Sequence, residues 1–189
     1  MSKWYKTEEL KEVTYTCGHC GAFVSPSKGY LTLSYTGSIP PYEVIGICPK
    51  CDKPTYKIST ETYPASKKGM DVTGINDLEL ENIYDEARRT FQVNAYTSCV
   101  LCCRKALMHI AVHCGAEENL KFIQYINYLE NNGYIPPNGR EWVDKIRKLG
   151  NEATHEIIIS SEKDAEMAIM FLGMLLKFIY EMPNMLDNF

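Results

Sequence analysis

Two cysteine pairs in the first third of the chain constrain its fold more than any other feature. Cys17 and Cys20 stand in the segment TCGHCG, and Cys48 and Cys51 stand in ICPKCD. Two such C-x-x-C turns can present four thiolates to one Zn²⁺ ion at about 2.3 Å in a tetrahedron. We therefore predict one structural zinc ion per chain. A redox-active C-x-x-C pair or four unrelated thiols are the alternatives for the same spacing.

The predicted zinc site has no open position for catalysis. His19 lies between the first two cysteines and competes as a ligand in principle, but four cysteines already complete a tetrahedral shell. A closed four-cysteine site leaves no coordination position for a substrate or a water molecule. We expect this metal to be structural.

The residues between the cysteine pairs predict strands and hairpins. The segment AFVSPSKGYLTLSYTGSIPPYEVIGI is rich in β-branched and aromatic residues and is punctuated by Pro and Gly. Residues 1–62 are therefore predicted to form a zinc ribbon, and residues 63–76, which show no periodicity, a linker. Because such a small ribbon has only a small hydrophobic core, metal binding should supply much of its folding free energy.

The remaining residues, 77–189, show helical periodicity. Five amphipathic or apolar segments are separated by short polar turns, which predicts an all-α antiparallel bundle of about five helices and, with the ribbon, an α+β fold. Asn76 and Glu79 are predicted to form a capping box at the first helix, and Ser161 and Asp164 at the fifth. The fifth helix is apolar over most of its surface, so it should be the central buried element.

A second group of cysteines and histidines falls within the second predicted helix. Pairs spaced by four residues share a helix face and can chelate a metal. The same segment is rich in aliphatic residues, so buried thiols acting as small hydrophobic groups are the simpler interpretation. The sequence leaves a second metal site open at Cys99, Cys103, His109, His113 and Cys114, with Cys102 beside them.

Charge and hydropathy exclude some classes of protein. The chain carries a net charge of -4, with a small basic excess before residue 76 and an acidic excess after it. That basic excess is too small to indicate nucleic-acid binding by itself. No segment reaches the roughly 18 apolar residues that a membrane span requires, and no signal peptide is recognisable. We expect a cytoplasmic protein without membrane contact.

The segment IRKLGNEATHE, residues 146–156, is the strongest candidate for a functional surface. Arg147, Asn151 and His155 recur every four residues. We expect them to lie opposite a core-facing stripe formed by Trp142, Ile146, Leu149 and Ala153. Such a polar face is either simply solvated or faces a cleft or a second subunit. In the second case Arg can hold a phosphate and His can transfer a proton near neutral pH.

The helical half resembles the bacterial domain of unknown function 4145. The resemblance runs from about Leu78 to Met182 through EARRTF, through A-Y-x-S-x-x-x-x-C-R-K-A-L, and above all through IRKLGNEATHE followed by DAEMAIMFLGMLL. That family is similar to HEPN helical proteins, many of which are metal-independent ribonucleases of toxin and antiphage systems. It also occurs fused to restriction-endonuclease subunits.

The resemblance implies a ribonuclease motif and a dimer. In active HEPN ribonucleases an Arg directly precedes a polar residue, His follows a few positions later, and two subunits bring their motifs together. Here Asn151 and His155 match, but Gly150 occupies the position of the arginine. Arg147 lies one turn earlier, where it either reaches the same phosphate or is structural.

Two functions follow. The first is an accessory module that binds RNA, DNA or a restriction or defence protein, with an inactive helical domain that forms a homodimer. The second is a metal-independent endoribonuclease that uses Arg147 and His155 across the dimer, with Asn151 beside them. We favour the first because the motif arginine is absent and the predicted zinc site is closed.

Overall fold

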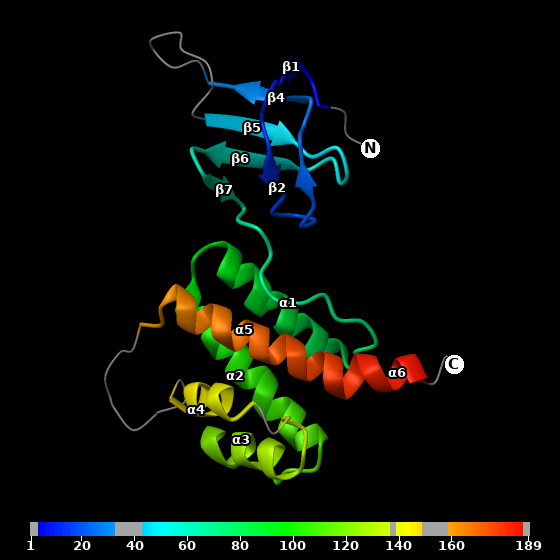
Figure 1. The fold of residues 1–189 in the computed structure, drawn as a ribbon, viewed down its shortest axis with the longest axis vertical. Helices are drawn as coiled ribbons and strands as arrows, with labels where there is room; N and C mark the ends of the chain where they lie inside the picture. Colours follow the sequence, from blue (N-terminus) through cyan, green and yellow to red (C-terminus); the bar gives the residue numbers. More distant parts are fainter. Residues whose placement is uncertain (1–3, 33–42, 137–138, 149–158, 187–189) are drawn as a thin grey trace. The chain divides into compact units, whose positions relative to one another are not determined.

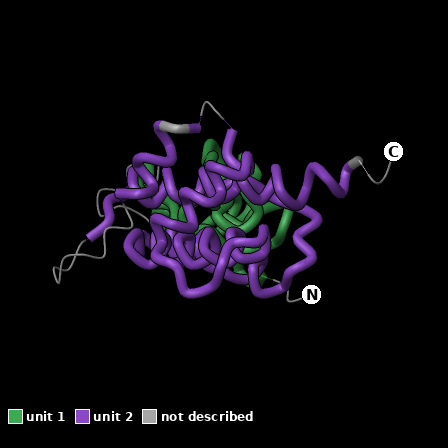
Figure 2. The backbone as a smooth tube through the Cα atoms, turned by 90° about the horizontal axis from the view of Figure 1, so that it is seen from below, with its two compact units in different colours: residues 1–67 green, residues 68–189 purple. Residues whose placement is uncertain are grey.

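The protein consists of two compact units. The computed structural model describes residues 4–32, 43–136, 139–148 and 159–186 (Figure 1). Residues 1–67 form the ribbon unit and residues 68–189 the helical unit (Figure 2). The boundary divides the segment predicted as a linker, because residues from Lys68 onward associate with the helices. Met70 of that segment, for example, is held by the side chain of Tyr84. The Tyr84 hydroxyl donates to the Met70 carbonyl at 2.8 Å and accepts from the Met70 N–H at 3.0 Å.

The ribbon unit contains two antiparallel sheets. The larger has five strands in the order β1 (Glu8–Glu9), β4 (Lys28–Leu31), β5 (Glu43–Ile47), β6 (Pro54–Ile58) and β7 (Glu61–Tyr63). The smaller pairs β2 (Tyr15–Thr16) with β3 (Phe23–Val24). This unit and the helices after it confirm the predicted α+β class.

Alternation along β5 separates a core face from an exposed face. Val44 is 2% exposed, whereas its neighbour Ile45 is 38% exposed. Gly46 permits the close approach of Tyr15, because a Cβ atom at residue 46 would lie 2.6 Å from the Tyr15 hydroxyl oxygen. The small core includes two of the cysteines and consists of Leu10, Val13, Tyr15, Cys17, Val24, Val44 and Cys48. The thiols are therefore part of the hydrophobic core of this unit.

The described residues of the helical unit form five main helices. They are α1 (Leu78–Gln92), α2 (Tyr96–His113), α3 (Phe122–Asn131), α4 (Arg140–Lys148) and α5 (Glu162–Leu176). A π-helical turn, η2 (Lys177–Glu181), and α6 (Met182–Leu186) continue α5. In Figure 1, α5 lies along α1 and α2, α3 packs beside α2, and α4 packs against α3 and α5. No helix among the described residues is long and apolar enough to cross a membrane.

Helix α5 is the central buried helix, as predicted. Ser161 caps it, and its side chain and that of Asp164 form the predicted capping box. Eight of its residues are buried, among them Phe171, Leu172 and Leu176, each with 0% exposure. Gly173 admits the Tyr84 hydroxyl, which would lie 2.6 Å from a Cβ atom at that position. The helix therefore packs closely against α1.

The start of α1 differs from the prediction by one residue. Asp77, not Asn76, is the N-cap residue, and its Oδ1 accepts a hydrogen bond from the Leu80 N–H at 3.0 Å. Its second oxygen, Oδ2, lies 2.7 Å from His109 Nε2 on α2. The Asp77 carboxylate thus caps α1 and also joins α1 to α2 through His109. An amide such as that of Asn76 carries no negative charge for these interactions.

Stability of the helical unit should depend on the charge of Asp77. Its pKa is lowered by the hydrogen bond from the Leu80 N–H and by His109. A lowered pKa means that the stabilisation is complete above the unfolded-state pKa of about 3.9 and is lost as the pH falls through the lower folded-state value. We expect Asp77→Ala to destabilise the unit by about 0.5–2 kcal/mol at pH 7.

Urea unfolding followed by helical circular dichroism tests this prediction. The stability difference between wild type and Asp77→Ala should shrink as the pH falls from about 5 to about 2. Asp77→Asn is the matched control, because it keeps an N-cap acceptor without a titratable group. A difference between wild type and Asp77→Ala that stays constant with pH would contradict the role of the charge.

The core stripe of α4 also differs from the prediction. Val143 and Ile146 are the buried residues, with 0% and 1% exposure, whereas Trp142 is 39% exposed. The indole of Trp142 instead stacks on Phe171 at 6.2 Å between ring centroids and covers the edge of the core. The expectation that Trp142 faces the core was therefore wrong. Residues 149–158, which contain the rest of the predicted stripe, lie outside the described residues.

Candidate metal centre

The four cysteines of the ribbon unit converge on one point. All four Sγ atoms lie within 4.8 Å of one another. The distances from Cys17 to Cys51 and from Cys20 to Cys48 are both 3.7 Å. Sulfur atoms bound at 2.3 Å to a tetrahedral ion are about 3.8 Å apart, so the cluster has the dimensions of a four-coordinate site. The four side chains can hold one metal ion.

The two C-x-x-C turns share the same backbone hydrogen bonds. In the first, the Cys17 N–H donates to the Ala22 carbonyl and the Gly21 N–H to the Cys17 carbonyl, both at 2.8 Å. In the second turn, the N–H of Cys48 donates to the carbonyl of Lys53, and the Asp52 N–H to the Cys48 carbonyl. The spacing from donor to acceptor is identical in the two turns, so the ribbon presents its two cysteine pairs by one repeated structure.

Both turns require a left-handed residue after the second cysteine. Gly21 has a φ of +70°, and Asp52, at the equivalent position, has a φ of +56°. Gly adopts this conformation freely, and Asp is among the few other residues that tolerate it. The glycine was visible in the sequence, whereas the equivalence of Asp52 appears only in the structure.

Hydrogen bonds and burial act on the thiols in opposite directions. Burial disfavours the Cys17 thiolate, but the N–H groups of Cys20 and His19, together with the side chains of Cys48 and Thr55, outweigh it and bring the pKa of Cys17 down to about 7. Burial, with the neighbouring thiols, raises the pKa of Cys51 to about 12. Four thiols this close cannot all ionise by themselves, whereas a bound divalent cation offsets their charges. The chemistry of the cluster therefore fits a metal ion.

Thr55 and His19 lie next to the cluster but do not belong to it. Thr55 has 0% exposure, and its hydroxyl donates to Cys17 Sγ at 3.8 Å. The ring of His19 is not part of the cluster, because its Nε2 lies 3.0 Å from the Pro54 carbonyl oxygen. Sequence reasoning missed Thr55, since a threonine four residues after a cysteine pair carries no recognisable signal.

The first turn packs closely on the chain that follows β7. A Cβ atom at Gly18 would lie 2.0 Å from the Pro64 carbonyl oxygen, which is backbone and cannot rotate away. We therefore expect Gly18→Ala to destabilise the ribbon unit by about 1–3 kcal/mol and to weaken metal binding. Competition with a chromophoric zinc chelator measures the affinity.

Gly21→Asn is the matched control for Gly18→Ala. A Cβ atom at Gly21 meets nothing within 4 Å, and Asn tolerates the left-handed conformation. The control should lose much less affinity than Gly18→Ala. Equal losses in the two variants would show that the contact with Pro64 is unimportant.

The second group of cysteines and histidines does not form a metal site among the described residues. Cys99 and Cys103 are fully buried in the core between the helices. His109 pairs with Asp77, and the ring of His113 lies 5.5 Å from that of Tyr180. Each side chain has a structural environment of its own, which agrees with the interpretation of these thiols as core residues.

Of the three polar residues of the ribonuclease-like motif, the structure describes only Arg147. Its Nε donates to Asn127 at 3.0 Å, its Nη1 lies 2.9 Å from Asp144, and its Nη2 pairs with Glu130. Asn127 and Glu130 belong to α3, so Arg147 ties α4 to α3 rather than facing away from the bundle as predicted. Asn151 and His155 lie outside the described residues.

Fold and site together define a two-part protein: a β ribbon with a four-cysteine metal-binding cluster, joined to a bundle of five main helices. A family model described as "Domain of unknown function (DUF4145)" matches residues 85–188. Because the match covers more than half of the chain, the protein belongs to the DUF4145 family. Searches of curated proteins and of solved structures found no match.

Proposed function

We propose that the ribbon holds one structural Zn²⁺ ion through Cys17, Cys20, Cys48 and Cys51. Four thiolates in a tetrahedron are the ligand set typical of structural zinc, whereas hard octahedral ions such as Mg²⁺ and Ca²⁺ prefer oxygen donors. The burial of Cys17 and Cys48, at 0% and 1%, supports a structural role, because it leaves little space for a substrate. The ion supplies folding free energy to a unit with a small core.

We further propose that the whole protein is an accessory binding module without catalytic activity. The observation that carries this proposal is the engagement of Arg147 with Glu130, Asp144 and Asn127. An arginine held by two carboxylates is poorly available to stabilise the charge of a phosphorane, and Gly150 replaces the motif arginine. The proposed ligands are nucleic acid or a protein partner of a restriction or antiphage system, and the proposed assembly is a homodimer.

The test is incubation of purified protein with mixed RNA, beside the variant His155→Ala. The accessory role predicts no cleavage by either protein, and its nucleic-acid alternative predicts a mobility shift of RNA or single-stranded DNA. Cleavage by the wild type that His155→Ala abolishes would establish the ribonuclease instead. Size-exclusion chromatography with light scattering tests the dimer separately.

A further inference from the structure

A groove between α4 and α5 has the composition of a binding site. Its volume is about 680 Å³. Trp142, Met167 and Met170 contribute apolar surface, and Lys145, Lys148 and Lys163 contribute positive charge. The Trp142 ring and the three lysines are exposed. The groove lies in the helical unit and shares no residue with the four-cysteine cluster.

The two acidic residues that line the groove already have partners, and only Asp164 keeps a carboxylate without a cation beside it among the described residues. Glu166 pairs with Lys68 at 2.8 Å. Asp164 accepts hydrogen bonds from the Ser161 N–H and hydroxyl at 2.9 and 2.6 Å, within the first turn of α5. The three lysines, in contrast, have no ion-pair partner within the part of the chain that the structure describes. The groove is therefore locally basic in an acidic protein, which favours an anionic ligand.

Trp142 provides a flat apolar surface within this basic groove. One side of its indole stacks on the buried ring of Phe171, with an angle of 26° between the ring planes. The ring is fixed by that contact, yet 39% of the residue remains exposed. A fixed and partly exposed indole is suited to stacking with a planar group.

From these observations we infer that the α4–α5 groove binds single-stranded nucleic acid. A base stacks on Trp142, and the lysines neutralise neighbouring phosphates. Lys145 and Lys148 are three residues apart on α4, so they stand on the same side of the helix and can contact one backbone. A run of Asp and Glu residues would match the charge but has no aromatic ring to stack on the indole. The inference rests on the proposed function with nucleic acid as the ligand, and it assigns the α4–α5 groove as the site that binds it.

Tryptophan fluorescence offers a direct test. The chain has two tryptophans, so Trp4→Phe leaves Trp142 as the only one. Titration of this full-length protein with a 12-nucleotide oligo(U) or oligo(dT) strand should quench the emission of Trp142. Comparison of the two strands shows whether the groove prefers RNA or DNA, since only RNA offers 2′-hydroxyl groups.

Variants of the groove test the contacts one at a time. Lys145→Gln/Lys148→Gln should reduce the salt slope by about 1.4 and weaken binding about 25-fold at 0.1 M salt. Lys105→Gln/Lys121→Gln, which removes the same charge elsewhere on the helical unit, should retain most of the affinity. With binding followed by the fluorescence anisotropy of a labelled strand, Trp142→Ala should weaken binding between about 5- and 150-fold, and Trp142→Phe should restore part of it. Circular dichroism verifies that each variant is folded.

Three outcomes would overturn the inference. If strands bind and the groove variants behave like the control, the site is elsewhere, although the proposed function stands. If no strand binds, the site and the nucleic-acid alternative both fail. If a tryptophan-free poly-Glu peptide quenches Trp142 and the strands do not, the groove is a protein-docking surface.

Discussion

Cys48→Ser is expected to abolish metal binding and to unfold the ribbon unit. Cys48 is 1% exposed, belongs to the core of that unit and lies 3.7 Å from Cys20. Structural zinc contributes about 10–16 kcal/mol of apparent binding free energy in small zinc domains, and a unit this small is marginally stable on its apolar core alone. Zinc content should fall from one ion per chain to nearly none, and protease should cleave within residues 1–67.

Cys102→Ser is the matched control for this experiment. Cys102 is a partly buried thiol on α2, remote in sequence from the cluster and not part of it. This variant should keep a full complement of zinc and a protease-resistant ribbon. Helical circular dichroism should be largely retained in both variants, since the helices form a unit with their own core. A Cys48→Ser protein that keeps its zinc would contradict the assignment of the ligands.

Phe171→Ala should produce the largest loss of stability in the helical unit. Phe171 has 0% exposure on the central helix and supports the ring of Trp142. Truncation of a buried phenylalanine costs about 3–5 kcal/mol, because apolar contacts are lost and a cavity remains. For a unit of this size that loss corresponds to a decrease in Tm of about 10–20 °C. Thermal unfolding followed at 222 nm measures it.

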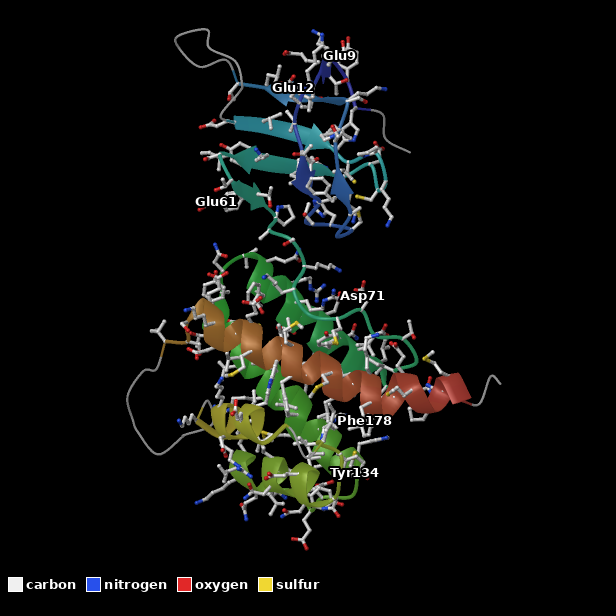
Figure 3. The ribbon with its side chains drawn as sticks, in the orientation of Figure 1. Glu9, Glu12, Glu61, Asp71, Tyr134 and Phe178 are labelled. Atoms are coloured by element: carbon white, nitrogen blue, oxygen red, sulfur yellow. The ribbon has the colours of Figure 1, made fainter. Side chains whose placement is uncertain are left out.

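Phe178→Ala makes the same chemical change in the same continuous helical run. Phe178, labelled in Figure 3, is 46% exposed on the π-helical turn that follows α5. Its truncation should cost less than about 1 kcal/mol, because surface substitutions remove few contacts. Zinc content should be unchanged in both variants. Equal destabilisation by the two truncations would contradict the central position of α5.

The sequence allowed the architecture to be predicted because its strongest signals are local. The spacing of the cysteine pairs, the change from strand-like to helical periodicity and the capping box at Ser161 each depend on a few neighbouring residues. These signals were sufficient for the α+β class and the central α5. The family was recognised from longer motifs, above all IRKLGNEATHE, and the comparison of residues 85–188 confirms it.

Features that depend on contacts between elements were not predictable in this way. The cap at Asp77 is favoured over Asn76 partly because His109, 32 residues later, lies 2.7 Å from its carboxylate. Arg147 appeared to face away from the bundle, but α3 places Asn127 and Glu130 beside it. Thr55 contacts Cys17 only because β6 brings them together. Helical periodicity gives the angle of a side chain about its own helix, and it does not reveal which neighbour stands at that angle.

Metal analysis of protein purified without added metal tests the central claim most directly. Mass spectrometry of the metals should give one zinc ion per chain, and a thiol-specific reagent should release it together with loss of the β-sheet signal of the ribbon. Zinc far below one ion per chain in reduced, folded protein, or release of zinc without any change in the ribbon, would contradict a structural zinc site at the four cysteines.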